Sequence, residues 1–164
     1  MRRCVLILAA AAICVGLAAP ASALAGKTWV VKNAAGKRIG TAHRNNSTRA
    51  GVYGLDGVQC GWISATSDGG FSAAYALPGA GGIGKSVLIE TTGDPGSPWL
   101  LMNPYREDTI EGIVRKRGRF WKVQRKVGET YRTYGSVRVA CPAWLAGGAV
   151  FILSDKWEVS GATD

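Results

Sequence analysis

The sequence predicts a mainly β protein, a single compact antiparallel sandwich or barrel-like roll with one short C-terminal helix. Short runs of β-branched and aromatic residues recur at intervals of about 8–12 residues, which is typical of antiparallel strands joined by tight turns. The 23 glycines among the 164 residues are spread along the chain and mark those turns. Only one segment, near the C-terminus, has a helical pattern.

The first strands are predicted to form two similar hairpins. In each, a turn glycine, Gly36 or Gly57, separates two β-rich runs, and a second glycine follows four residues later, at Gly40 or Gly61. Two copies of this frame indicate successive hairpins rather than a solenoid, which needs at least three units. Alternation of side-chain type over 131–139 predicts a further strand near the end of the β region.

The candidate helix spans residues 142–153 and opens with a proline, which suits the first helical position. Gly147 and Gly148 in its middle argue against it, because each glycine costs up to about 1 kcal/mol relative to alanine. The apolar run 150–153 is equally compatible with a buried strand. We therefore predict a helix to about Ala149 and leave the rest of the segment open.

Residues 1–25 have the layout of a secretory signal peptide. Arg2 and Arg3 give a positive start, an apolar stretch follows, and small residues allow cleavage after Ala23 or Ala25. The apolar stretch is shorter than the roughly 20 residues that a membrane span needs. The alternative is an uncleaved N-terminal anchor.

The leader predicts a protein that works outside the cytoplasm, in the extracellular or periplasmic space, as one β-rich domain over residues 26–164. We expect no transmembrane segment after cleavage, because no other stretch is long and apolar enough. The net charge of the full chain is +9, and loss of the two arginines lowers it by two, to +7. A basic secreted protein suits an anionic partner, such as a cell-surface polymer, whereas we do not expect nucleic acid. The host organism and the oligomeric state stay open.

The cysteine count also depends on the leader. Cys4 and Cys14 leave with it, so Cys60 and Cys141 remain in an oxidising compartment and are predicted to form a disulfide. A bond closing about 80 residues would stabilise the fold by roughly 4 kcal/mol. The alternative is two free thiols. We expect no metal site, since His43 is the only histidine and two cysteines cannot complete four ligands.

The most basic part of the chain is predicted to be a hairpin, with strands over about 109–115 and 120–126 and a tip near Gly118. Arginine forks there could hold phosphate, sulfate or carboxylate groups, and an aromatic ring could stack on a base or sugar. The alternative is a solvated hairpin whose tryptophan faces the core. The candidate anion-binding residues are Arg115, Lys116, Arg117, Arg119 and Trp121.

Residues 79–86 match the phosphate-binding pattern G-x-x-x-x-G-K-[ST] in full, with Lys85 and Ser86 in the last two positions. In that motif the serine opens a helix, but the residues after Ser86 are β-branched and soon reach a glycine. The surrounding chain also lacks the alternating strand–helix pattern of a parallel sheet. We therefore expect a glycine-rich loop and no cofactor, with a nucleotide site kept as a third hypothesis.

Catalytic residues are hard to find. A hydrolase would have to use His43, or the acidic group Glu107, Asp108 and Glu111, and no G-x-S-x-G nucleophile elbow is present. The sequence favours a secreted, non-enzymatic binding or structural module for anionic extracellular surfaces, with a secreted hydrolase as the alternative. The pattern names no ligand or substrate.

Overall fold

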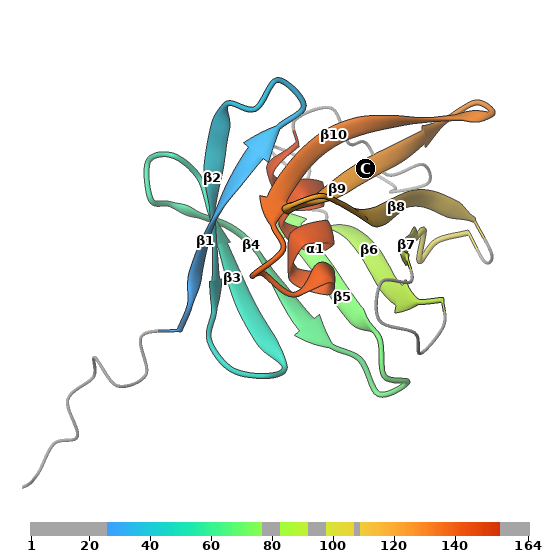
Figure 1. The fold of residues 1–164 in the computed structure, drawn as a ribbon. Coiled ribbons are helices and arrows are strands. Elements are labelled where there is room, and N and C mark those ends of the chain that lie inside the picture. The colour runs from blue at the N-terminus through green and yellow to red at the C-terminus, as the bar shows by residue number, and fades with distance from the viewer. Residues whose placement is uncertain (1–25, 77–82, 92–97, 107–108, 155–164) are drawn as a thin grey trace, which may run out of the picture.

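The computed structural model describes residues 26–76, 83–91, 98–106 and 109–154, so the predicted leader, residues 1–25, lies outside the described residues. The chain forms ten strands followed by one helix (Figure 1). In chain order these are β1 (Thr28–Asn33), β2 (Arg38–Arg44), β3 (Arg49–Tyr53), β4 (Gln59–Ala65), β5 (Phe71–Ala76), β6 (Ile83–Glu90), β7 (Trp99–Met102), β8 (Ile110–Arg117), β9 (Phe120–Val127), β10 (Thr130–Arg138) and α1 (Ala143–Leu153).

Each strand pairs antiparallel with the next, and β10 pairs with β1, so the sheet closes into a barrel. The predicted fold class is confirmed, and of the two forms left open the barrel is the one adopted. The seam is short: β1 and β10 pair through Lys32 with Ser136 and Asn33 with Gly135. The predicted successive hairpins are β1–β2 and β3–β4.

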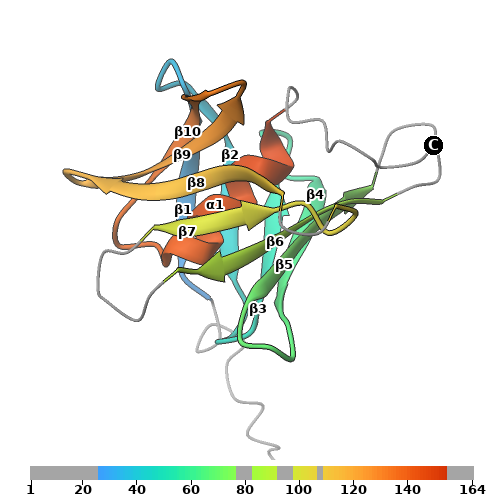
Figure 2. The same cartoon turned by 90° about the vertical axis from the view of Figure 1, so that its right-hand side faces the viewer.

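Helix α1 lies inside the barrel and contacts all ten strands (Figures 1 and 2). The predicted helix is confirmed and continues through Leu153, so the run 150–153 is helical rather than a strand. Residues 143–152 are all buried. A helix that is apolar on every side needs a buried environment, and the barrel interior provides it.

The two glycines that argue against a helix are what allow α1 to fit. A Cβ placed on Gly147 would lie 2.7 Å from side-chain atoms of both Leu88 and Val114. A Cβ on Gly148 would lie 2.6 Å from Cδ1 of Ile63, on another part of the wall. The loss of helix propensity is therefore offset by close packing between the helix and the strands.

The second glycine of each hairpin repeat has a matching role at the other end of α1. Gly40 faces Leu153, with 2.7 Å between a Cβ placed on the glycine and Cδ1 of the leucine. Gly61 faces Ile152 in the same way, at 2.9 Å from Cγ2. The repeat therefore encodes two hairpins and, in addition, room on the inner wall for the bulky last turn of the helix.

The predicted Cys60–Cys141 disulfide is absent from the structure, and both cysteines are free thiols. Cys141 is buried just before α1 begins, whereas Cys60 is exposed on β4 beside Gly61, which faces the last turn of α1. An 11-residue helix is roughly 16 Å long. A disulfide requires Cα atoms within about 7 Å, so the two cysteines lie too far apart to bond.

Aromatic rings pack on both ends of the helix. At its start, Trp144 stacks on Phe71 of β5, with ring centroids 4.0 Å apart and planes 2° from parallel. Near its end, Phe151 meets Tyr75 of the same strand edge-on at 5.4 Å. These contacts fix the depth of α1 in the barrel, so the inner wall is committed to packing and the outer face carries the candidate sites.

Candidate anion-binding surface

Strands β8 and β9 form the predicted basic hairpin. They turn at Gly118, which has a φ of +56° that favours glycine. Val114 and Val123 are paired across the hairpin and completely buried, so they define its inner face. Because side chains alternate along a strand, the positions next to these valines point away from the barrel.

The five predicted residues do not form one cluster. Arg115 and Arg117 are exposed on the outer face, whereas Lys116 pairs with Trp121 on the inner face near the end of the barrel. Arg119 lies in the turn.

The Trp121 ring is not available for stacking on a ligand in the way the sequence suggested. Its indole packs against the core, and its Nε1 donates a hydrogen bond of 2.7 Å to the carbonyl oxygen of Cys141. The alternative that this tryptophan faces the core is therefore confirmed.

The outer face continues far beyond the hairpin. Arg115 is the cross-strand partner of Lys122, Lys122 of Ser136, Ser136 of Lys32, and Lys32 of Arg38. Partners across a ladder project to the same side of the sheet, and neighbouring strands are about 4.8 Å apart. One row across β8, β9, β10, β1 and β2 therefore carries four cations around a single serine.

A second row runs parallel to the first, two residues along the strands, or about 7 Å away. It joins Arg117, Phe120 and Arg138, with the phenylalanine between two arginines. The ammonium of Lys122 sits 5.8 Å from the centre of the Phe120 ring, a cation–π distance that links the two rows. We call the cations of both rows the basic belt, which comprises Lys32, Arg38, Arg115, Arg117, Lys122 and Arg138.

The basic belt has no compensating negative charge in the described part of the chain. No ion pair joins a belt cation to another described residue, and no acidic residue occupies a position in either row. The described acidic residues lie in turns or at strand ends instead: Asp56, Asp68, Glu90, Glu111 and Glu129. Like charges directly opposite each other on a ladder repel, so the belt is an electrostatically unfavourable surface until an anion binds.

Sequence reasoning missed four of the six belt residues. Lys122 lay within the basic segment, and Arg138 joins the belt through the β9–β10 ladder. Lys32 and Arg38 join it only because β1 closes against β10. The available signal was strand alternation, since each of these positions is adjacent to a core residue and so faces outward.

The match to the phosphate-binding motif is coincidental. Lys85 and Ser86 lie within strand β6, so the serine opens no helix. The Ser86 side chain is completely buried, and its hydroxyl donates a hydrogen bond of 3.2 Å to the carbonyl oxygen of Met102. Part of the motif, residues 79–82, lies outside the described residues, but these two positions suffice to exclude the nucleotide-site geometry.

His43 has no catalytic partner in the described part of the structure. It lies on the outer face of β2, where its two ring nitrogens are 3.1 Å from the hydroxyl of Thr28 and 3.4 Å from that of Thr41. The imidazole also meets Tyr53 edge-on, with centroids 4.7 Å apart. These contacts indicate that the imidazole packs on the surface of the barrel and is not arranged for proton transfer.

Of the three acidic residues proposed for a hydrolase, the structure describes Glu111 alone, because Glu107 and Asp108 lie outside the described residues. Glu111 is 7% exposed, and its Oε1 accepts a hydrogen bond of 2.9 Å from the Asn103 amide. Its Oε2 has no hydrogen-bond partner. The residue lines a hollow of about 220 Å³. The hydrolase hypothesis therefore retains one buried carboxylate, and among the described residues no cluster of side chains is suited to hold a metal ion.

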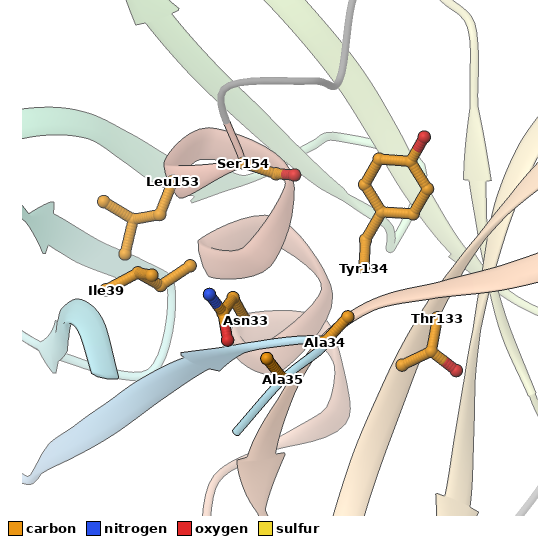
Figure 3. A pocket seen from close by; sticks show the side chains of 8 residues that line it. All are labelled: Asn33, Ala34, Ala35, Ile39, Thr133, Tyr134, Leu153 and Ser154. Atoms are coloured by element: carbon orange, nitrogen blue, oxygen red, sulfur yellow. The ribbon is translucent and has the colours of Figure 1, made fainter. Parts of the chain in front are cut away.

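A hollow of about 360 Å³ opens where α1 ends (Figure 3). Leu153 and Ile39 form one side of it and Tyr134 lies across from them, while Asn33 approaches from β1. Among the described residues, its lining contains no charged side chain and none of the predicted site residues. It therefore adds nothing to the anion-binding surface.

The fold and the belt together define a helix-filled antiparallel barrel with a basic outer surface. Comparison of the chain with protein-family models, with curated proteins and with solved structures gives no match. In the part that the structure describes, no helix is both long and apolar enough to cross a membrane.

Proposed function

We propose that this protein is a secreted, non-enzymatic binding module whose basic belt holds linear anionic polymers at an extracellular or periplasmic surface. The observation that carries the proposal is the row from Arg115 to Arg38, where four cations lie on five adjacent strands with no acidic residue among them. A bound polyanion would relieve the repulsion within that row.

A polymer suits the belt better than a small anion does. Four strand spacings of about 4.8 Å make the row roughly 19 Å long. Because the barrel wall is convex, the side chains fan out, and a compact ion could reach only two neighbouring cations. A flexible chain can follow the curve and engage all four, so that each contact raises the effective concentration for the next.

The experiment compares two variants that lose the same charge. The belt variant carries Lys32→Gln, Arg115→Gln and Lys122→Gln, and the control carries Lys27→Gln, Lys85→Gln and Arg132→Gln, three exposed cations outside the belt. On a matrix bearing dextran sulfate, the belt variant should elute at clearly lower salt than the wild type, while the control should elute close to it. Equal shifts for both variants would mean that net charge alone causes retention and would refute the proposal.

Competition experiments distinguish the sources of negative charge. Soluble linear polyphosphate should displace the wild-type protein from the matrix at far lower phosphate concentration than inorganic phosphate does. Vesicles containing phosphatidylserine should compete poorly, since a flat membrane meets few cations of a convex row. Belt-dependent binding to vesicles without binding to polyphosphate would overturn the choice of a polymer.

The secretion part of the proposal has a separate test. When the full chain is expressed in a secreting host, the mature protein should begin at Leu24 or Gly26, as measured by intact mass. A cytoplasmic product that retains residues 1–25 would contradict it.

A further inference from the structure

A different outer face, formed by β3 and β4, presents an isolated tryptophan. Trp62 is 43% exposed, and its two cross-strand partners are Gly51 on β3 and Ala74 on β5. These are the two smallest residues, so neither supplies a side chain that could cover the flanks of the indole. The large apolar ring of Trp62 is thereby left nearly half exposed on the outer face of the sheet.

A hollow of about 310 Å³ adjoins this indole. Gly51 and Ala50 of β3 and Ile63 of β4 line it beside the indole. The Tyr53 ring lies over Gly51, since a Cβ on the glycine would lie 2.8 Å from the tyrosine hydroxyl. The rim carries amide, hydroxyl and guanidinium groups from both strands and the loop between β2 and β3. The polar residues of the rim are Asn45, Arg49, Gln59 and Ser64.

We propose that this hollow binds a neutral saccharide built from pyranose rings with equatorial substituents, such as a β-linked glucose or N-acetylglucosamine oligomer. Such a ring presents a flat face of axial C–H groups that can lie on an indole, while its hydroxyls radiate in the ring plane. The polar groups of the rim offer both donors and acceptors for those hydroxyls. An apolar platform edged by a few polar groups is the usual composition of a small-ligand site.

This site does not depend on the basic belt. No belt residue lines the hollow, and the hollow contains one cation, Arg49, rather than a row of them. Binding of a neutral sugar should therefore persist at salt concentrations that abolish binding of a polyanion.

The test titrates the full-length mature protein with cellotetraose and, separately, with chitotetraose, and follows backbone amide chemical shifts by NMR. Shifts confined to β3, β4 and the β2–β3 loop are expected, unchanged by high salt. Trp62→Ala should raise the dissociation constant roughly tenfold, because stacking on an aromatic ring contributes to affinity on this scale. Tyr131→Ala removes another exposed aromatic ring that lines none of the three hollows and serves as the matched control.

The outcomes decide the proposal in either direction. Trp62→Phe, which keeps a ring, should retain part of the affinity. An amide spectrum of Trp62→Ala that matches the wild type away from β3 and β4 shows that the alanine variant is folded. Absence of shifts in the wild type with both sugars up to millimolar concentrations would overturn the proposal. So would equal affinity of the wild type and Trp62→Ala. The belt variant should bind these sugars normally, so failure of the polymer proposal leaves this one intact.

Discussion

Arg115 and Lys122 are direct partners across the β8–β9 ladder, and both side chains face outward. The next position in the row is an uncharged serine, followed by Lys32 on β1. Two like charges directly opposite each other disfavour the folded state. The same pair of positive charges favours a bound anion. At this position the charges therefore lower the stability of the fold and raise the affinity for an anion.

Charge reversal at Lys122 should separate those two effects. Lys122→Glu converts the pair with Arg115 from repulsive to attractive, so the free energy of unfolding should rise by roughly 0.5–1 kcal/mol at low salt. The gain should shrink at high salt because exposed charges are screened. Urea denaturation at two salt concentrations measures both effects, with Lys122→Gln as the uncharged control. A salt-independent loss of stability would show that this lysine is needed for packing instead.

Filling the gap at Gly148 should destabilise the protein, although alanine is the better helix former. A Cβ would lie 2.6 Å from Cδ1 of Ile63, so the variant Gly148→Ala should lose about 1–3 kcal/mol through overpacking. Chemical denaturation checks the sign. The double variant with Ile63→Val, which removes the opposing atom, should recover part of the loss. An increase in stability for Gly148→Ala alone would mean that α1 does not approach the wall so closely.

The same glycines show how far the sequence could predict the fold. Strand runs and turn glycines identified the antiparallel hairpins, because alternation and turns are local properties. The position of α1 inside the barrel was not visible, since it depends on which wall residues meet Gly147 and Gly148. From the sequence alone, two adjacent glycines argue against a helix. Their packing role becomes clear only once their neighbours on the barrel wall, Leu88 and Ile63, are known.

The two thiols should react very differently. Cys60 is exposed, whereas Cys141 is 1% exposed, so a disulfide-exchange reagent should label one thiol in the native protein and two after unfolding. Cys60→Ser should abolish labelling of the native protein. No labelling before reduction and two thiols after it would show that the cysteines are joined, which would contradict the separation of the two residues along α1.

Alkaline pH should act on stability through Cys141. Burial raises the pKa of this thiol far above its ordinary value of 9.0, and the positive charge of Arg44 opposes that shift only in part. The unfolded chain can lose the proton above about pH 9, whereas the folded chain keeps it, so stability should fall as the pH rises beyond that point. Denaturation of wild type and Cys141→Ala between pH 8 and 10.5 should show the steeper loss in the wild type. Identical slopes would mean that the thiol is not shielded.

The candidate anion-binding surface could be predicted only in part from the sequence. The basic run revealed Arg115 and Arg117, because those charges are close together in the chain. Lys32 and Arg38 could not be added without knowing that β1 closes against β10 and in which register. The sequence left open whether Trp121 faces a ligand or the core, because the hydrogen bond to the Cys141 carbonyl that places it against the core joins distant segments.

The salt dependence of polyanion binding tests the basic belt most directly. The affinity of the wild type for linear polyphosphate should fall linearly with salt on a double-logarithmic plot, as counterions are released. Each cation that contacts a flexible polyanion adds about 0.7 to the slope, so the belt variant, which lacks three, should have a slope shallower by about two. The control variant, which lacks Lys27, Lys85 and Arg132, should keep the wild-type slope. Equal slopes for the belt and control variants would contradict the account.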